Sequence, residues 1–337
     1  MNAIIIHSGN TFSPYITDCI EQFFLYNKKS MLYFILDTMS EKVNILKNIY
    51  PNLRIIYQKE LKKSLSHRFY LTFNRSAHNN WRGGFWRYVV ERFFLIQEFM
   101  HQSGEINLLH FEYDNLIYET INDFENRFIN ISNAEKILLT ADGDKRCIAG
   151  LMFIPNSKSL AKFCNFYNRH YTIHIKNDMF AFSDFLDKCP RFCGTLPVVP
   201  KSYTKDKASM YSHKGIMHTK LNRLSDGADI FEAVFDAAAY GQFVGGIDQR
   251  NVEDSTKSTI GFINPDSAYN MQDFSIEWHT KNNLTKPFLC FKNEILPIFN
   301  LHIHSKNLNL YRSDLIKGTN IYHLSLFVPF IKSERYK

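Results

Sequence analysis

The order of the apolar segments at the start of the chain constrains the fold most. An apolar run over residues 3–7 is followed by a polar loop, and apolar side chains then recur at helical spacing between Tyr15 and Phe24. A second apolar run over 31–36 ends at Asp37. The order strand, helix, strand is typical of a parallel sheet covered by helices. We therefore predict an α/β fold with a mostly parallel central sheet and helices on both faces.

Composition permits such a fold and excludes several classes of protein. The chain has 337 residues, of which 45% are hydrophobic, so a sizeable core is feasible. No apolar run reaches the roughly 18 residues of a membrane span. The first residues lack the basic start and long apolar stretch of a signal peptide, so we expect a cytoplasmic protein. Forty basic and 33 acidic residues leave a net charge of +7, which suits an anionic partner.

Polar residues follow the first two predicted strands. His7 ends the first predicted strand, Asn10 follows in the loop, and Asp37 comes after the second strand. Ligands of parallel α/β sheets bind beyond the carboxyl ends of the strands, so these three residues are candidates for ligand contacts. Neither a G-x-G-x-x-G fingerprint nor a P-loop occurs in the chain.

Two carboxylates follow a third apolar run. The strand predicted over 106–111 leads into Glu112-Tyr113-Asp114, and residues two apart in an extended chain point to the same side. Glu112 and Asp114 could therefore hold one divalent cation, which prefers oxygen ligands. A second acid-x-acid triplet, 142–144, lies between two apolar runs and contains Asp-Gly, which is typical of a hairpin turn. We assign that second triplet a structural role.

Two predicted helices carry further charged candidates. The helix predicted over 85–100 carries Arg87 and Arg92, and the start of a helix favours anions. A helix predicted over 231–243 places Glu232 and Asp236 on one face. These residues either take part in helix packing or supply a carboxylate on the acceptor side of an active site.

Near the C-terminus, His302 and His304 alternate along an extended run and Lys306 follows. Imidazole can complete a carboxylate metal site, and lysine can neutralise phosphate. The polar stretch 197–226 is predicted to be a loop that could be mobile and act as a lid. Residues 311–337 are predicted to form a C-terminal packing or membrane-peripheral segment.

Taken in order, these segments resemble the GT-A class of nucleotide-sugar-dependent glycosyltransferases. Glu112-x-Asp114 is similar to the D-x-D motif of that class, with Glu112 where Asp is usual. Residues 149–155 resemble the apolar strand that follows this motif, and Asn177-Asp178 resembles the acidic segment near the reaction centre. The run 302–306 is similar to the H-x-G-x-x-K segment of members related to glycosyltransferase family eight, without its Gly and with another lysine spacing.

The resemblance implies a GT-A-like fold with a Rossmann-like donor-binding half over 1–115 and an acceptor-binding half over 116–310. It implies transfer of a sugar from a nucleotide-diphosphate sugar, most often a UDP-sugar, with Mn²⁺ or Mg²⁺. The acceptor would be a hydroxyl of a glycan or glycolipid, as in polysaccharide biosynthesis. It also implies peripheral membrane contact through the basic, apolar C-terminal segment, and no nucleic acid would be bound.

The resemblance also implies roles for individual residues. Glu112, Asp114 and one of His302 and His304 would bind the metal. The residues that would contact the donor are His7, Asn10, Asp37, Arg87, Arg92, Tyr113 and Lys306. Asp236 or Asp178 would be the catalytic base of an inverting enzyme. In a retaining enzyme, which the C-terminal match slightly favours, Asp178 would lie beside the sugar.

Two other classes of function stay open. A metal-dependent phosphohydrolase or nuclease could use Glu112, Asp114 and His304, although two-metal sites need more acidic ligands. A non-catalytic nucleic-acid-binding or scaffold protein fits the positive charge and the 15% aromatic residues, although these aromatics fall at the helical spacing of a core.

Overall fold

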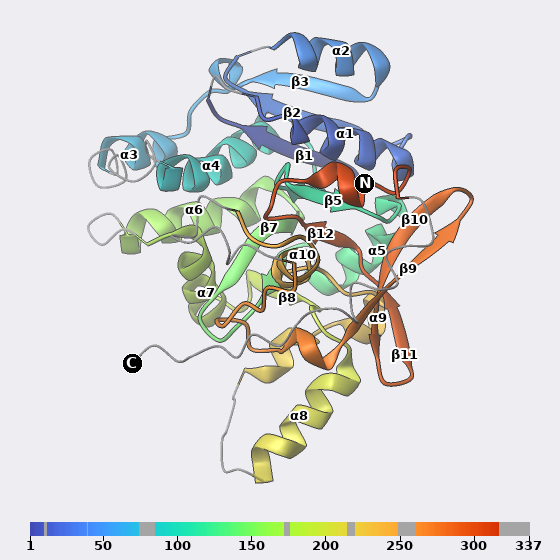
Figure 1. Cartoon of the computed structure of the whole chain (residues 1–337). Coiled ribbons are helices and arrows are strands. Elements are labelled where there is room, and N and C mark those ends of the chain that lie inside the picture. Colours follow the sequence, from blue (N-terminus) through green and yellow to red (C-terminus); the bar gives the residue numbers. More distant parts are fainter. Residues whose placement is uncertain are drawn as a thin grey trace.

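A seven-stranded sheet forms the centre of the computed structural model, in the order β3-β2-β1-β4-β7-β6-β8 (Figure 1). Its strands are β1 (Asn2–His7), β2 (Leu32–Leu36), β3 (Leu53–Tyr57), β4 (Leu108–Phe111), β6 (Ile137–Ala141), β7 (Cys147–Ile154) and β8 (Cys193–Leu196). Of these seven, β7 alone runs antiparallel to its neighbours. The structure describes residues 1–9, 12–38, 40–73, 85–171, 176–213, 220–248 and 260–316, and for 208–213 it describes the backbone alone.

Helices cover both faces of this sheet. One face packs on α1 (Tyr15–Tyr26), α2 (Glu41–Ile49) and α5 (Ile121–Ser132). The other packs on α3 (Leu65–Phe73), α4 (Phe85–Ser103), α6 (Ser157–Tyr171) and α7 (Asp178–Lys188). The alternation of side chains in β1 explains this division, because Ile5 joins the first core and Ile4 and Ile6 join the second. The predicted α/β fold, mostly parallel and covered on both faces, is confirmed.

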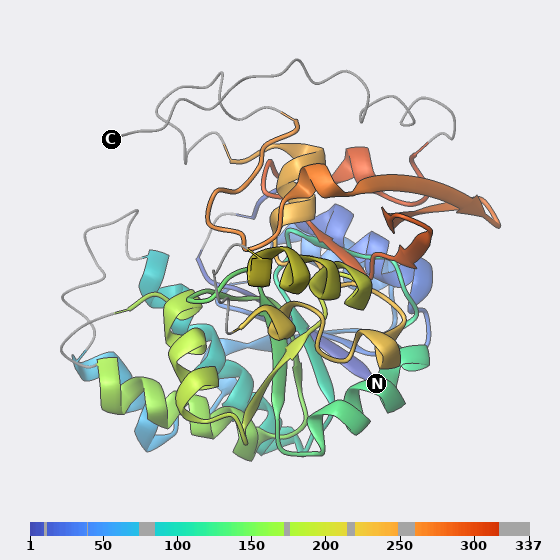
Figure 2. The ribbon, with the colours of Figure 1, turned by 90° about the horizontal axis from the view of Figure 1, so that it is seen from below.

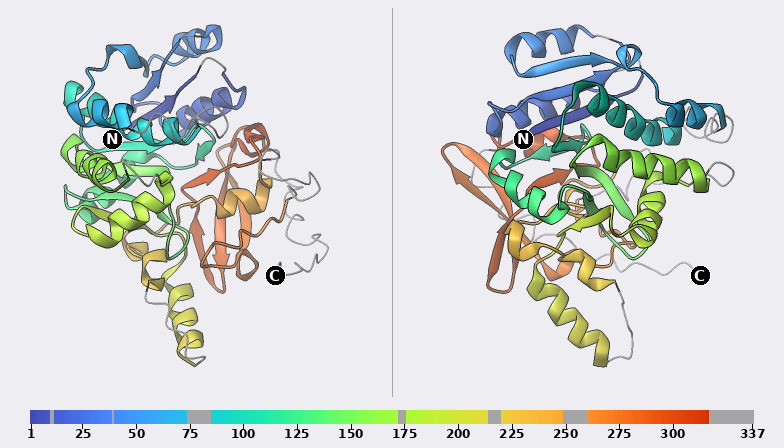
Figure 3. Two further views of the ribbon diagram at one scale, coloured as in Figure 1. Left: turned by 90° about the vertical axis from the view of Figure 1, so that its left-hand side faces the viewer. Right: turned by 180° about the vertical axis from the view of Figure 1, so that it is seen from behind.

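The C-terminal third forms a further layer beside the central sheet, drawn in orange and red in Figures 2 and 3. A three-stranded antiparallel sheet consists of β9 (Ser275–Lys281), β10 (Leu284–Phe291) and β11 (Glu294–Pro297). The short strand β12 (Asn300–His302) pairs antiparallel with β5 (Asn115–Ile117). Strand β5 follows β4 in the chain after one turn. This pairing brings the C-terminal histidines to the carboxyl end of β4.

The range 197–226, predicted to be a loop, contains a helix. Helix α8 (Lys201–His213) stands away from the body of the molecule (Figures 1 and 3). Its first turn follows Pro200, a residue that suits the start of a helix, and the hydroxyl of Tyr203 donates to Asp273 at 3.0 Å. The short helix η2 (Leu221–Leu224) follows residues 214–219, which lie outside the described part.

The helix predicted over 231–243 was wrong. Helix α9 (Ala228–Phe231) ends at Glu232, whose φ is 48°, and α10 (Ala239–Gly245) begins after Ala238, whose φ is 70°. Glu232 and Asp236 therefore share no helical face. The remaining short helices are η1 (Gln58–Glu60), η5 (Met271–Asp273) and η6 (Leu308–Tyr311).

No helix among the described residues is long and apolar enough to cross a membrane. Of the predicted C-terminal segment 311–337, residues 317–337 lie outside the described part.

Candidate functional site

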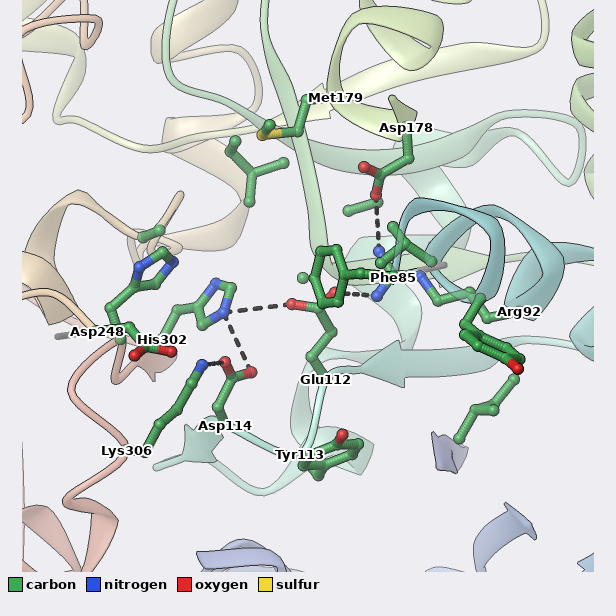
Figure 4. Close-up of a pocket in the computed structure, with 18 of the residues that line it drawn as sticks. Phe85, Arg92, Glu112, Tyr113, Asp114, Asp178, Met179, Asp248, His302 and Lys306 are labelled. Carbon is green, nitrogen blue, oxygen red and sulfur yellow. Dashed lines mark hydrogen bonds and ion pairs between the residues drawn. The ribbon is translucent and has the colours of Figure 1, made fainter. Parts of the chain in front are cut away.

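A cavity of about 730 Å³ opens where the carboxyl ends of β1 and β4 lie side by side. The order of the strands reverses here, because β1 has β2 on one side and β4 on the other. Ligands of open α/β sheets bind at such a switch point. Its lining includes residues from the end of β1, the start of α4, the turn after β4, strand β7, the start of α7, helix α10 and the run after β12. Figure 4 shows labelled side chains from α4, the turn after β4, α7 and the run after β12 converging.

Glu112, Asp114 and His302 point toward one another in this cavity (Figure 4). The Nε2 atom of His302 lies 3.3 Å from Glu112 Oε2 and 3.1 Å from Asp114 Oδ1. One potential ligand atom from each residue lies within 4.8 Å of the other two. Asp114 Oδ1 is buried and faces the imidazole of His302. Two carboxylates and an imidazole, so close together, form a donor set that Mn²⁺ or Mg²⁺ can occupy.

Hydrogen bonds to backbone atoms fix the positions of the segments that carry Glu112, Asp114 and His302. The Gly150 carbonyl on β7 accepts from Glu112 N at 2.8 Å and from the side chain of Asn115 at 3.0 Å. Ile303 N donates to the Asp114 carbonyl at 2.8 Å, next to the pairing of β5 with β12. The turn after β4 is thus tied on one side to β7 and on the other to the strand that carries His302.

Gly150 also lies directly beneath the imidazole. A Cβ atom at this position would lie 2.8 Å from His302 Nδ1 and 2.9 Å from its Cε1. Gly241 on α10 is similarly confined, since a Cβ there would meet the His302 carbonyl oxygen at 1.9 Å. His302 therefore sits between two surfaces that only glycine allows.

Asp236, a predicted catalytic base, does not line the cavity. Its carboxylate is buried and accepts three backbone hydrogen bonds, from Tyr240 at 2.9 Å, Gly241 at 2.8 Å and His302 at 2.9 Å. Burial raises the pKa of Asp236 to about 6, although these hydrogen bonds oppose the rise. The carboxylate thus joins the start of α10 to β12.

Two cations pair with the carboxylates. Lys306 Nζ contacts Asp114 Oδ2, and the guanidinium of Arg92 contacts Glu112 on one side and Asp178 on the other, the latter at 2.8 Å (Figure 4). Burial would raise the pKa of Asp114, but His302 and Lys306 together hold that pKa well below its usual range. Asp114 is therefore ionised near neutral pH. Burial is the main cause of the raised pKa of Asp178, which Arg92 opposes.

The structure brings some of the predicted donor contacts to the other end of the cavity. Tyr113 stacks on Tyr15, with ring centroids 5.7 Å apart, and lies 5.5 Å from the ring of His7. Both ring nitrogens of His7 are buried without a hydrogen-bond partner among the described residues. Asp37 does not line the cavity but accepts from Gly9 N at 2.9 Å, which orders the loop after β1. Asn10 lies outside the described residues.

Arg87 and His304 stand apart from the metal ligands. Arg87 does not line the cavity, and its Nε lies 3.7 Å from Glu91 on the same helix. His304 lines the cavity, but its Nδ1 lies 3.3 Å from the Gln242 side chain. Burial lowers the pKa of His304 to about 3, helped by His302 and Lys306. Of the two histidines, His302 is the one beside both carboxylates.

His110 and Asp248 are among the lining side chains that the sequence did not single out. His110 lies on β4, two residues before Glu112, so the spacing H-x-E-x-D was a readable signal for it. Its Nδ1 lies 3.1 Å from the Ile4 carbonyl, and its buried Nε2 has no hydrogen-bond partner among the described residues. Asp248 follows α10 and also lines the cavity. No local pattern singled it out.

The second acid-x-acid triplet has no place among the metal ligands in the described part of the chain. It lies in the turn between the antiparallel strands β6 and β7, and buried Asp142 pairs with Arg146. This agrees with the structural role predicted for it.

No protein-family model matches the sequence, and no curated protein matches it either. Among solved structures, apo mouse xyloside xylosyltransferase 1 overlaps it with a TM-score of 0.39 at 9% identity, over 62% of this chain and 91% of the mouse chain. The apo form of glycosyltransferase GlyE from Streptococcus pneumoniae gives 0.36 at 10% identity, over 64% and 51%. The Mn/GDP form of core-mannan synthase A from Aspergillus fumigatus gives 0.36 at 7% identity, over 58% and 72%. These are partial overlaps of the backbone at low sequence identity.

Proposed function

We propose that this chain is a metal-dependent glycosyltransferase that moves a sugar from a nucleotide-diphosphate sugar to a hydroxyl of a glycan or glycolipid. One observation carries the proposal. Glu112, Asp114 and His302 meet beside Lys306 in a cavity at the switch point of an α/β sheet. A cation site next to a fixed ammonium group suits a substrate with concentrated negative charge, such as a diphosphate.

The donor set fits Mn²⁺ or Mg²⁺, because ionised carboxylates supply hard oxygen ligands and imidazole suits first-row metals. The buried Asp114 Oδ1 faces the His302 imidazole, so two potential ligand atoms of one ion already lie 3.1 Å apart. When bound, the ion supplies positive charge that stabilises the departing nucleoside diphosphate. Arg92 fixes the orientation of the Glu112 carboxylate by pairing with it.

Lys306 supplies the second positive charge of the site. Its ammonium group lies against Asp114 and stays protonated, since Asp114 raises the pKa of Lys306 although burial opposes this. A diphosphate beside Asp114 would therefore meet a charged donor of hydrogen bonds. In this proposal Lys306 binds the diphosphate, whereas Arg92 orients the Glu112 carboxylate that binds the metal.

The aromatic end of the cavity is proposed to hold the nucleoside. The stacked pair Tyr15 and Tyr113 offers flat surfaces, and the unpartnered ring nitrogens of His7 offer hydrogen bonds to a base or ribose. We take a UDP-sugar as the first candidate donor. Residues 1–115 then hold most of the donor, with His302 and Lys306 added from the acceptor half, residues 116–310.

We further propose that the reaction retains the configuration of the sugar. Asp236 lies outside the cavity, and Asp178 is engaged by Arg92, so neither is placed as an unpaired base. Asp178 would instead lie beside the sugar and keep Arg92 in place. His110 Nε2, a buried acceptor, would take a hydrogen bond from a sugar hydroxyl.

The test is a thermal-shift and hydrolysis screen of UDP-, GDP-, CMP- and dTDP-sugars with and without Mn²⁺, run on the protein and on Asp114→Ala. We expect one donor to raise the melting temperature only with Mn²⁺, and the variant to lose this shift. Asp144→Ala, in the exposed part of the second acid-x-acid triplet, is the matched control and should behave like the unmodified protein. No shift with any donor in the folded protein would overturn the proposal.

A further inference from the structure

Helix α3 presents apolar side chains to solvent in a regular row. Leu65, Phe69 and Phe73 recur every four residues and are 83%, 42% and 53% exposed. The rings of Phe69 and Phe73 pack on each other with centroids 4.5 Å apart. An exposed apolar row of this kind is typical of an interaction surface, because isolated apolar side chains rarely align by chance along one face.

The opposite side of α3 is firmly held by the protein. His67 is fully buried between Glu98, 3.0 Å from its Nδ1, and Glu91, 3.2 Å from its Nε2. Tyr70 is also buried, and its hydroxyl donates to the Arg87 carbonyl at 2.9 Å. The outward row is therefore fixed in orientation and cannot turn inward to bury itself.

Basic residues predominate in and just before α3. The stretch 58–73 contains four basic residues and one acidic residue, and Lys62, Lys63 and Arg68 are exposed. Arg169 on α6 is exposed next to Asn168, whose side chain donates to Ser66 on α3. We call Leu65, Phe69 and Phe73 with Lys62, Lys63 and Arg68 the α3 surface.

We propose that the α3 surface docks on an anionic lipid bilayer. Apolar side chains would enter the boundary between headgroups and acyl chains while the cations contact lipid phosphates, as interfacial helices do. Charge argues against a second copy as the occupant, because a twofold contact through α3 would place the same cations opposite one another. A bilayer with negative headgroups complements both the row and its surroundings.

The α3 surface lies close to the rim of the cavity. The bond from Tyr70 joins α3 to the start of α4, where Phe85 and Tyr88 are 43% and 42% exposed and also line the cavity. Figure 1 shows α3 and α4 side by side at one edge of the molecule. Docking would bring this rim to the lipid surface. A lipid-borne acceptor follows from this placement, and that last step alone rests on the proposed function.

Co-sedimentation with phosphatidylcholine vesicles, with and without phosphatidylglycerol, tests the docking without any sugar donor. We expect binding to the anionic vesicles only, weakened by salt. Phe69→Glu/Phe73→Glu and Lys62→Glu/Lys63→Glu should each lower the partition coefficient about tenfold or more. Ile45→Glu/Ile49→Glu is the matched control, because these α2 side chains are 52% and 56% exposed away from the α3 surface. It should bind as the unmodified protein does.

Three results would overturn the docking. Equal binding to vesicles with and without phosphatidylglycerol would show that the cations of the α3 surface do not contribute to binding. Unchanged binding of Phe69→Glu/Phe73→Glu, with an unchanged melting temperature, would assign lipid contact to another segment, such as residues 317–337. A dimer that this variant dissociates, with no vesicle binding, would show that a second copy covers α3. Failure of the donor screen leaves the docking test intact, so the two proposals fail separately.

Discussion

At the scale of single residues, the space beneath His302 sets the geometry of the metal site. Gly150→Ala would place a methyl group 2.8 Å from His302 Nδ1 and 3.4 Å from Glu112 Oε2, so the imidazole must move. Because groups that orient metal ligands typically change affinity 10- to 100-fold, we expect Mn²⁺ to bind about tenfold more weakly. Isothermal titration of the protein with Mn²⁺ measures this loss.

Gly194→Ala is the matched control for that titration. Gly194 lies on β8 of the same sheet, and a Cβ there would meet only side-chain carbons, Leu138 Cδ2 at 3.0 Å and Lys136 Cδ at 3.6 Å. Its Mn²⁺ affinity should equal that of the unmodified protein. Equal affinities for both alanine variants would contradict the placement of His302 over Gly150.

Lys306 and a metal ion would compete for Asp114. Lys306→Met removes the positive charge that lies against the Asp114 carboxylate and repels a cation there. We therefore expect Mn²⁺ alone to bind several-fold more tightly. The same variant should bind a nucleoside diphosphate with Mn²⁺ about tenfold more weakly, because a charge-assisted contact is lost. Calorimetry of both ligands distinguishes the two effects. Lys286→Met removes a lysine paired with Glu119 elsewhere and should change neither affinity.

An acid-x-acid triplet at the end of a predicted strand was enough to predict Glu112 and Asp114 as a pair, although both lie in the turn after β4 and not in an extended strand. The sequence could not decide between His302 and His304, because that choice depends on where β12 ends and the chain turns. Two other predicted residues, Arg87 and Asp236, do not line the cavity. Helical spacing was applied to Asp236 where the backbone is irregular, and the side chain of Arg87 lies beside Glu91 on its own helix.

At the scale of elements, the ion pairs of His67 join α3 to α4. Burial lowers the pKa of His67, but Glu91 and Glu98 outweigh it and raise the pKa above 6.5. The folded-state pKa thus exceeds the unfolded-state pKa, so this contribution to stability is complete below pH 6.5 and is lost as pH rises through the folded-state pKa. We expect the free energy of unfolding to fall over that pH range.

His67→Gln should remove this pH dependence and cost about 3 kcal/mol below the unfolded-state pKa, because it removes the cation that pairs with buried Glu98 and leaves Glu91 with Arg87. Denaturant unfolding across pH measures both effects. His101→Gln, at an exposed position of α4, is the control and should keep the dependence of the unmodified protein. The same slope in His67→Gln would contradict the ion pairs.

The periodic elements were the predictable ones. Apolar spacing gave β1, α1, β2, α4 and the strands β6 and β7 with their hairpin turn. Helix α8 was missed because its sequence is polar and has little apolar periodicity, so only its anchor at Tyr203 and the preceding Pro200 indicate it. The pairing of β5 with β12 has no local signal, since each strand has three residues and its partner is far along the chain.

At the scale of the whole molecule, the sheet order explains why the site is where it is. Parallel strands on either side of β1 open a crevice at their carboxyl ends. The C-terminal layer then closes that crevice with β12 and delivers His302 and Lys306 to it. Sequence order predicts the crevice and its carboxylates, whereas the closing layer depends on contacts between distant segments.

Anomalous diffraction at the manganese edge, from crystals grown with Mn²⁺ and UDP, tests the central claim most directly. The account predicts one strong peak within about 2.5 Å of Glu112, Asp114 and His302 side-chain atoms, with the diphosphate of UDP beside Lys306. Crystals of Asp114→Ala should lose the peak. Manganese bound elsewhere, or UDP bound away from these residues with no metal beside it, would contradict the assignment of this cavity as a metal-dependent sugar-donor site.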